Sequence, residues 1–596
     1  MNMLFIHPTL VLLAGALLLP FTRGPLRRVC LLVVPLLTLG AVLFNLGPAG
    51  SYGHFTVLDW PLVFGRVDTL ASVFALIMAI MTVLATLYSL GVERTGEHVA
   101  AWFYAAASLG VIYCGDVISL FLFWEMMTFA SVFLVWFRGT AAAGAAGFRY
   151  LLIHVIGSTI LLTGIMLQYQ ETASIAFTLL DVHQPAPATW LIMLGFGLNA
   201  ALVPLHSWLP DACGEASFNG SVFLCAFTTK TAVYALARGC AGMEILVPLG
   251  VIMALYGVVY AIMENDIRKV LAWSTVSQVG YMVAAVGLGT EMAINGAAAH
   301  AVVHLLYNSL LFMATGSVLY MTGKTRFTEL GGLYQKMPAT LFFTIIGCLS
   351  ISAAPYFAAY VSRDMIVASL FAEHVNWAGW LLKLSAVGTF LYHGLRLPYY
   401  LFYGENHCDE ATWKRAADPA VSMLAAMGLA AAICLVVGIW PEFLYALLPF
   451  PVHYQPFTSY HLVETLQMLG FGTLAFYLLK KYVEPVDRIC LDLDWLYRKA
   501  GIWLLWLVCQ PLQLIETIWG QAYHTVGLRS LMGTARFLSW FDWYGIDSVV
   551  DDLACSVRRL GDKVRVLQSG QIQVTLYIAF AFAAVLLVAF IFSQLA

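Results

Sequence analysis

The chain has 596 residues, of which 61% are hydrophobic and 11% are charged, and its formal net charge at pH 7 is -3. Soluble proteins contain about 25% charged residues, so the composition excludes an ordinary soluble protein and indicates an integral membrane protein. The small net charge argues against nucleic acid as a partner. The 11 cysteines include no CxxC and no metal-type spacing, so we expect no metal or redox cofactor.

Apolar stretches of about 20 residues, each long enough to cross a bilayer, recur from end to end. They predict an all-α polytopic membrane protein with about 14–16 transmembrane helices. Lys and Arg alternate with loop parity, which predicts an N-terminus outside the cell. The candidate spans are 3–20, 28–46, 68–91, 98–114, 116–138, 147–169, 189–207, 219–239, 244–263, 272–289, 291–321, 339–371, 377–402, 419–439, 460–479 and 572–594.

Two of these spans carry an ionisable side chain in the middle. Glu125 lies within 116–138 and Lys230 lies within 219–239. A charge at this depth costs at least about 2.5–3.5 kcal/mol on insertion scales, and a buried carboxyl or amine can gain or lose a proton when its surroundings change. The pair is a candidate for moving protons or cations. The alternatives are a neutral Glu hydrogen-bonded between helices and a structural Glu–Lys ion pair.

Two apolar segments are interrupted by proline, at Pro204 and Pro355. Such breaks persist in membranes where other helices or a water-filled cavity satisfy the freed backbone groups. Because they lie five spans apart, they predict inverted repeats, whereas the simpler reading is two proline kinks. The predicted domains are 1–97 (N-terminal helices), 98–241 and 242–405 (inverted five-helix repeats), 406–483 (C-terminal helices), 484–571 (an amphipathic lateral segment on the cytoplasmic side) and 572–596 (a last span).

A polar stripe follows the second charged span. His300, His304 and Asn308 are spaced i, i+4, i+8, which places them on one helix face. Imidazole can donate, accept and titrate near neutral pH, so the stripe is a candidate proton path. His154 is the lone histidine of its span, and we expect it to have a structural role.

Further along the chain, Arg363 and Asp364 follow the second break. Because adjacent residues point to different faces of a helix, Asp364 need not pair with Arg363. Arg does not deprotonate in proteins, so Arg363 sets a field instead of carrying protons. In the lateral segment, Trp-rich 501–517 either lies along the membrane surface or a partner, or crosses the membrane.

Five motifs in order resemble the antiporter-like membrane subunits of Mrp-type cation/proton antiporters, respiratory complex I and membrane-bound hydrogenases. The likeness covers residues 60 to 480 and is nearest to the D-type Mrp subunits, whereas the C-terminal end is more like the longest complex I pumping subunit. The motifs are GDVISLFLFWEMMTFASVFLVWF (115–137), PLHSWLPDA (204–212), TTKTAVYALAR (228–238), ENDIRKVLAWSTVSQVGYM (264–282) and HAVVHLLYNSLLFMATGSVLY (300–320).

The resemblance implies two inverted five-helix repeats, each with a broken helix, around a central polar axis. By motif, Glu125 and Lys230 correspond to the family's glutamate and lysine, and His300 and His304 to its histidines. The chain departs from the family where lysines are common, because Asn199 and Asn308 stand there, and Arg363 stands where Lys or Glu is frequent. Lys230 is then the candidate partner of Glu125.

The leading hypothesis is a transport subunit that translocates protons, exchanged for or coupled to a monovalent cation such as Na⁺. Its partners would be other membrane subunits of a complex, in the inner membrane of a bacterium or archaeon. Because the chain has no nucleotide or redox motif, partners or an ion gradient supply the energy. One alternative is a pumping subunit of a redox complex. The other is a subunit that couples the membrane to an inorganic-carbon uptake enzyme.

Overall fold

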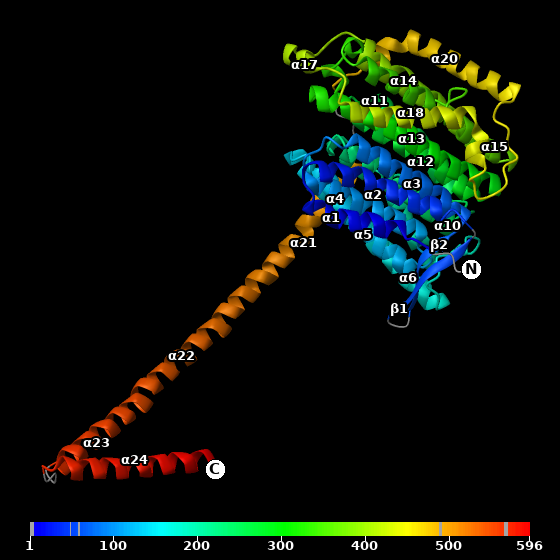
Figure 1. Cartoon of the computed structure of the whole chain (residues 1–596). Helices are drawn as coiled ribbons and strands as arrows, with labels where there is room; N and C mark the ends of the chain where they lie inside the picture. Colours follow the sequence, from blue (N-terminus) through cyan, green and yellow to red (C-terminus); the bar gives the residue numbers. More distant parts are fainter. Residues whose placement is uncertain (1–4, 48, 58–59, 488–491, 566–569, 596) are drawn as a thin grey trace. The chain divides into compact units, whose positions relative to one another are not determined.

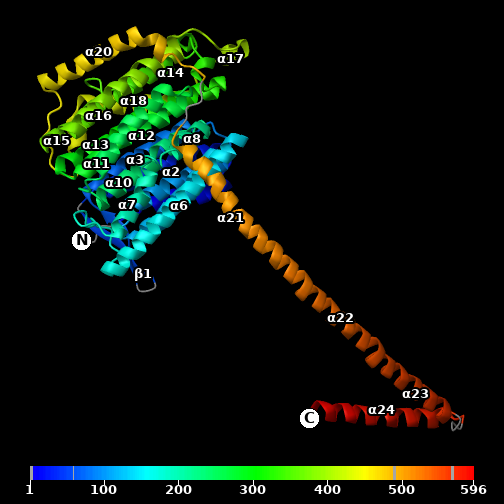
Figure 2. The same cartoon turned by 180° about the vertical axis from the view of Figure 1, so that it is seen from behind.

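The computed structural model describes every residue except 1–4, 48, 58–59, 488–491, 566–569 and 596. The chain divides into two compact units, Met1–Asp494 and Trp495–Ala596. The first unit is a stack of long helices with one hairpin, as Figures 1 and 2 show from two sides.

Helices make up most of the first unit. In chain order, those up to residue 239 are α1 (Pro8–Leu18), η1 (Leu19–Phe21), α2 (Gly24–Phe44), α3 (Thr69–Tyr88), α4 (Thr95–Tyr113), α5 (Val117–Trp136), α6 (Ala141–Thr172), α7 (Pro187–Asn199), α8 (Trp208–Glu215), α9 (Gly220–Ala226) and α10 (Thr228–Gly239). Then come α11 (Leu246–Met263), α12 (Ile267–Leu288), α13 (Glu291–Thr322), η2 (Phe327–Glu329), η3 (Leu333–Gln335), α14 (Pro338–Ile351), α15 (Tyr360–Ala372), α16 (Asn376–Thr389), η4 (Phe390–Arg396), η5 (Tyr399–Tyr403), α17 (Glu410–Arg415), α18 (Val421–Ile439), α19 (Pro441–Tyr445) and α20 (Ser459–Val483).

The predicted all-α polytopic membrane fold is confirmed. Every candidate span overlaps one or more helices, and within the described residues twelve helices are long and apolar enough to cross a membrane. The expected 14–16 spans also include interrupted or short ones. For example, α7 and α15 have 13 residues each and α14 has 14, because the chain breaks inside these spans.

A hairpin that the sequence analysis did not predict follows α2. Strand β1 (Gly50–Val57) pairs antiparallel with β2 (Trp60–Val67). The hairpin is attached to the start of α5, because the Val63 backbone N–H donates to Asp116 Oδ2 at 2.7 Å and the Gly115 N–H donates to the Val63 carbonyl at 2.8 Å.

The two predicted helix breaks are present and have matching geometry. The chain leaves helix after Asn199 and resumes at Trp208, and it leaves helix after Ile351 and resumes at Tyr360. Each break begins with an alanine in the left-handed region, at φ 61° for Ala201 and 53° for Ala353. Both turns close with a backbone hydrogen bond spanning five residues, Leu202 N–H to Gly197 O at 3.0 Å and Ala354 N–H to Leu349 O at 3.1 Å, the pattern of a Schellman motif.

The match extends beyond the breaks. Helices α6 and α13 each have 32 residues. The residue before α5 forms an isolated bridge with the segment after α6, Asp116 with Ala176, and the residue before α12 does the same after α13, Asp266 with Arg326. These correspondences support two structural repeats. That the repeats are inverted, and that they divide at 98–241 and 242–405, remain predictions.

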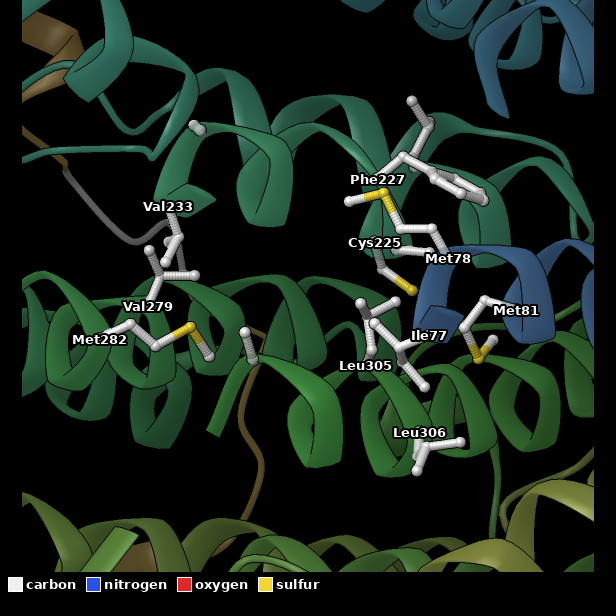
Figure 3. Packing of buried hydrophobic residues seen from close by; sticks show 14 of the residues in the cluster. Ile77, Met78, Met81, Cys225, Phe227, Val233, Val279, Met282, Leu305 and Leu306 are labelled. Atoms are coloured by element: carbon white, nitrogen blue, oxygen red, sulfur yellow. The ribbon is translucent and has the colours of Figure 1, made fainter. Parts of the chain in front are cut away.

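The interior of the first unit is packed with apolar side chains from α3, α9, α10, α12 and α13 (Figure 3). The most apolar windows of Gly220–Gly239 and Ile267–Leu288 are wholly buried and that of α13 is 94% buried, whereas that of α2 is 28% buried. Polar side chains on these inner helices therefore face protein and not lipid.

In the second unit the helical elements between residues 494 and 565 follow one another without a loop. They are α21 (Asp494–Ala522), which begins at the last residue of the first unit, η6 (Tyr523–Leu528), α22 (Arg529–Phe541), η7 (Asp542–Asp547) and α23 (Ser548–Arg565), and α24 (Ile572–Leu595) comes last. The predicted lateral segment is thus helical over residues 494–565. Its side of the membrane, and whether 501–517 crosses it, remain predictions.

Candidate functional site

Glu125 lies near the middle of α5 and is half-buried. The helix starts at Asp116, whose carboxylate accepts the Ser119 N–H at 2.7 Å and so caps the first turn. The side chain of Ser158 on α6 is a hydrogen-bond partner of the Glu125 carboxyl, and the Ser158 hydroxyl also donates to the His154 carbonyl at 2.8 Å. Glu125 therefore has a neutral partner from the neighbouring helix.

Lys230 lies in the first turn of α10 and is fully buried. Its Nζ donates to the carbonyl of Cys225 at 2.7 Å. Cys225 is in the last turn of α9, where helix carbonyls have no intrahelical donor. The interruption at Phe227 between α9 and α10 thus supplies the acceptor that a buried ammonium needs.

The direct Glu125–Lys230 pair suggested by the sequence does not occur among the ion pairs of the described residues. The physical reason is that each group has a local partner, Ser158 for Glu125 and the Cys225 carbonyl for Lys230. Proton exchange between them would have to pass through intervening groups or water.

His300 is the centre of a buried hydrogen-bond network. Its Nδ1 lies 3.0 Å from Ser362 Oγ on α15, and its Nε2 lies 3.1 Å from Gln278 Oε1 on α12. Gln278 Oε1 also accepts the Tyr307 hydroxyl at 3.4 Å, and Gln278 Nε2 donates to Thr389 Oγ1 at 3.4 Å. Because all five side chains are fully buried, the network fixes the position of an imidazole that can both give and take a proton.

His304 and Asn308 continue the face of α13, as the spacing predicts. The His304 ring is 6.1 Å from the His300 ring, centroid to centroid, and is close enough to Lys230 to be affected by its charge. Neither ring nitrogen of His304 has a protein hydrogen-bond partner among the described residues, whereas Asn308 Nδ2 donates to Thr275 Oγ1 at 3.0 Å. A buried imidazole in this setting is suited to hydrogen-bond water.

The structure brings Lys230, His304 and His300 into one row, and Asn199 lies at the first helix break. Asn199 is the last residue of α7, is fully buried, and has no hydrogen-bond partner for either side-chain amide atom among the described residues. Its position at the first break matches the sequence prediction.

Arg363 and Asp364 close the row at its other end. The Arg363 side chain is 3% exposed, and its guanidinium donates to the Ser352 carbonyl at 3.5 Å, in the second break. Arg363 contacts its neighbour, with Nε 3.8 Å from Asp364 Oδ1. The guanidinium is long enough to turn toward the next residue. Arg363 and Lys230 therefore both bind carbonyls freed at a helix interruption.

His154 has the structural role expected of it. Its Nδ1 lies 2.9 Å from the Tyr150 carbonyl, its ring stacks on the Tyr150 ring at 4.0 Å between centroids, and it meets the Trp208 ring edge-on at 4.6 Å. These contacts hold α6 against α8.

Sequence reasoning missed Gln278, Thr275, Ser362 and His393. His393 is fully buried in η4 and acts electrostatically on His304, and neither of its ring nitrogens has a partner among the described residues. The signal was present in the polar run Ser274–Gln278 of a span that proved wholly buried. Among the residues described, no group of three or more His, Cys, Asp or Glu could hold a metal ion.

Together these features define a class: a polytopic helical membrane protein with a buried row of basic side chains beside two helix breaks. Residues 114–391 match the family described as "NADH:quinone oxidoreductase/Mrp antiporter, TM". The resemblance to antiporter-like membrane subunits is therefore confirmed over this part of the chain. The nearer likeness to the D-type Mrp subunits remains a prediction.

Two curated relatives illustrate the similarity. Hydrogenase-4 component B of Escherichia coli (strain K12) is 28% identical over 420 residues, which are 63% of this chain and 62% of that protein. Na(+)/H(+) antiporter subunit A1 of Staphylococcus aureus (strain JH9) is 29% identical over 437 residues, which are 65% of this chain and 54% of that protein. The chain thus spans less than two thirds of the length of these relatives.

Two solved structures share the fold. The Mrp complex from Dietzia sp. DQ12-45-1b contains a chain with a TM-score of 0.71 at 22% identity, covering 89% of this chain and 62% of that one. The membrane-bound sulfane sulfur reductase (MBS), an archaeal respiratory membrane complex, contains one with a TM-score of 0.69 at 22% identity, covering 98% of this chain and 99% of that one.

Proposed function

We propose that this protein is a proton-translocating membrane subunit of a larger complex and that it exchanges protons for a monovalent cation such as Na⁺. The observation that carries the proposal is the buried row from Lys230 through His304 and His300 to Arg363. Similarity to an Na(+)/H(+) antiporter subunit supports the choice of ion.

Glu125 and each side chain in the row have a role that fits their chemistry. Glu125 takes up and releases a proton, because its partner Ser158 is neutral and can hydrogen-bond either form. Lys230 exchanges a proton with the row, since an amine, unlike a guanidinium, can give up its proton. His304 and His300 relay protons, and Arg363 contributes a fixed positive charge.

Asn199 and Asn308 cannot titrate, but their amides can hydrogen-bond water along the path. Asp364 is the carboxylate at the far end of the row. The energy for transport comes from partner subunits or from an ion gradient, in the inner membrane of a bacterium or archaeon. No residue of the row has a catalytic role.

The test is proton flux through the purified complex reconstituted in liposomes, followed with an internal pH-sensitive dye. Replacing Glu125→Gln keeps size and hydrogen bonding but removes titration, so flux should fall at least about tenfold. Glu125→Asp should retain part of the flux. Undiminished flux in Glu125→Gln, with the complex intact, would overturn the proposal.

A second candidate is a subunit of a redox-driven pump. The structural match to a chain of an archaeal respiratory membrane complex extends over nearly the full length of both chains, which includes the lateral segment. Two measurements distinguish the candidates. An iron–sulfur subunit in the complex purified under mild detergent supports the redox pump. Proton flux of the reconstituted complex that needs only an ion gradient supports the antiporter.

A further inference from the structure

The segment between α18 and α20 forms a cavity of about 810 Å³. The segment consists of α19 and the loop 446–458, and it runs past the start of α15 to α20 (Figures 1 and 2). Small-molecule sites typically measure about 300–1,000 Å³. The polar and aromatic side chains that line this cavity are Glu442, Tyr445, Phe450, Tyr454, Gln455 and Phe457. None of them has a role in the proposed proton path, so the cavity needs a separate explanation.

The wall of the cavity is held in place by prolines and by hydrogen bonds. The prolines, each with a fixed φ, are Pro441, Pro449, Pro451 and Pro456. The Asn295 side chain of α13 bonds the Phe450 backbone twice, because its Nδ2 donates to the carbonyl at 2.9 Å and its Oδ1 accepts the N–H at 3.0 Å. The Tyr360 hydroxyl of α15 donates to the Pro456 carbonyl at 3.0 Å. A wall this well fixed loses little freedom when a ligand binds, which favours binding.

One phenol of the lining has a polar atom without a protein partner. The Tyr454 hydroxyl is buried and has no hydrogen-bond partner among the described residues, whereas the Tyr445 hydroxyl donates to the Val361 carbonyl at 2.7 Å. Buried hydroxyls nearly always have a partner, because an unpaired one loses its hydrogen bonds to water without compensation. The Tyr454 hydroxyl is therefore placed to bond a polar group of a ligand.

The charge around the cavity favours a cation. Among the described residues of the lining, Glu442 is the one charged side chain, and it takes part in none of the described ion pairs. The carboxylates of Glu442 and Asp364 act electrostatically on the Tyr445 phenol, and that of Asp364 also acts on Tyr454. With no basic side chain in the described lining, an anion would lack a partner.

The aromatic rings indicate which kind of cation fits. Mg²⁺ and Ca²⁺ are bound by several oxygen ligands, whereas this lining offers one carboxylate beside aromatic rings, which attract ammonium groups. Phe457 already stacks on Tyr356 and Tyr360, at 5.2 and 5.5 Å between ring centroids. The rings of Tyr445, Phe450 and Tyr454 remain for a ligand.

We propose that this cavity binds an organic molecule that carries a primary ammonium group. The ammonium donates N–H bonds to the Glu442 carboxylate and the Tyr454 hydroxyl oxygen, and it lies against the rings of Tyr445 and Phe450. The carbon chain of the ligand packs on the prolines. The ammonium belongs to a free amine or to the ethanolamine headgroup of a phospholipid, which share this chemistry. The site is independent of the proposed function, so its test does not involve proton flux.

The probe is n-butylamine, a primary amine that is charged near pH 7, and its uncharged counterpart is n-butanol. Isothermal titration calorimetry measures their binding to the purified complex in phosphatidylcholine nanodiscs. We expect saturable binding of n-butylamine that is at least about tenfold tighter than binding of n-butanol, because hydrogen bonds to charged groups are the stronger ones. Equal affinity for the two probes would overturn the proposal.

Substitutions in the lining locate the site. Glu442→Gln should lower the affinity for n-butylamine about tenfold, and Tyr454→Phe about threefold. The matched controls are Glu373→Gln and Tyr460→Phe, which change exposed residues outside the lining and should keep the affinity. Thermal unfolding shows that each variant is folded. An unchanged affinity in Glu442→Gln, or the same loss in the controls, would overturn the proposal.

The two sources of the ammonium are separated by repeating the titration in phosphatidylethanolamine nanodiscs. Weaker binding of n-butylamine there supports the site with the lipid headgroup as occupant, because the headgroup competes. Equal affinity in both lipids supports the site with a free amine as ligand. The quaternary ammonium of phosphatidylcholine has no N–H to donate, so an absence of saturable binding in that lipid would contradict the site itself.

Discussion

Helices α6 and α13 have equal length and equivalent places in the two halves, yet their corresponding polar rows differ in chemistry. Counted from the helix starts, these rows are Tyr150, His154 and Ser158 on α6 and His300, His304 and Asn308 on α13. The first row has one imidazole, locked against aromatic rings. The second has two, one held in a network and one without a protein partner among the described residues.

The neighbouring helices differ in the same way. Ser158 meets the carboxyl of Glu125 on α5, and Asn308 meets the hydroxyl of Thr275 on α12. The first half therefore has a carboxylate, Glu125, where the second half has the imidazoles of His300 and His304. A break in helical hydrogen bonding then provides each half with an anchored cation, Lys230 or Arg363.

The largest expected effect concerns the two anchored cations. Lys230→Arg keeps the positive charge but removes the ability to deprotonate, so we expect proton flux to fall at least about tenfold. Proton flux should fall equally in Lys230→Met. Flux of the reconstituted complex is measured after native gel electrophoresis has shown assembly. Near-normal flux in Lys230→Arg would mean that Lys230 is only a fixed charge, as Arg363 is.

The next largest effect on proton flux comes from comparing matched substitutions in the two rows. His304→Phe removes the proposed proton relay and should lower flux about fivefold or more. His154→Phe, the matched change in the other row, keeps an aromatic ring beside Tyr150 and should change flux less than about twofold. The same liposome assay compares them. Equal losses in the two variants would show that the rows do not differ in function.

A smaller effect is expected at the centre of the second row. Gln278→Leu removes one hydrogen-bond partner from each of His300, Tyr307 and Thr389, and an unsatisfied buried polar group costs about 1–3 kcal/mol. The complex should therefore unfold at lower temperature and conduct more slowly, as thermal unfolding by tryptophan fluorescence and the flux assay would show. Ser277→Ala on the same helix, which removes a hydroxyl that donates to the Ala254 carbonyl, is the control and should keep the flux.

The smallest expected effect concerns Asp492, which lies outside both rows. Asp492 Oδ1 is 3.3 Å from His206 Nε2 and accepts the Tyr256 hydroxyl at 2.5 Å, so it ties the chain after α20 to the first break. Burial raises the pKa of Asp492, but hydrogen bonding and attraction to His206 and Tyr256 outweigh it, and the pKa lies below the usual value. A carboxyl group whose pKa is lowered by folding stabilises the folded state at pH values above its unfolded pKa. This stabilisation is lost as the pH falls.

The tie at Asp492 should therefore hold at neutral pH and weaken only below the ordinary value of 3.8. Asp492→Asn removes the charge and should weaken the tie by about 1 kcal/mol. Trypsin should then cleave at Lys481 faster at neutral pH. An unchanged cleavage rate would show that the contact does not hold this segment.

Hydropathy predicted the helices because bilayer-length apolar runs and mid-helix prolines have few alternatives. The same reasoning found Glu125, Lys230, His300 and His304, since charged or imidazole groups stand out in apolar sequence. Gln278 did not stand out, because a neutral amide resembles any polar residue until its partners from other helices are known. The hairpin β1–β2 was missed because its attachment to Asp116 is a long-range contact.

The central claim is that Glu125 changes protonation while the complex works. Infrared difference spectroscopy of the reconstituted complex, with glutamate isotopically labelled, compares the resting state with the state under an imposed ion gradient. The account predicts a carboxyl band that changes during transport and is absent in Glu125→Gln. A spectrum with the same carboxyl bands in Glu125→Gln as in the unaltered protein, during undiminished transport, would contradict it.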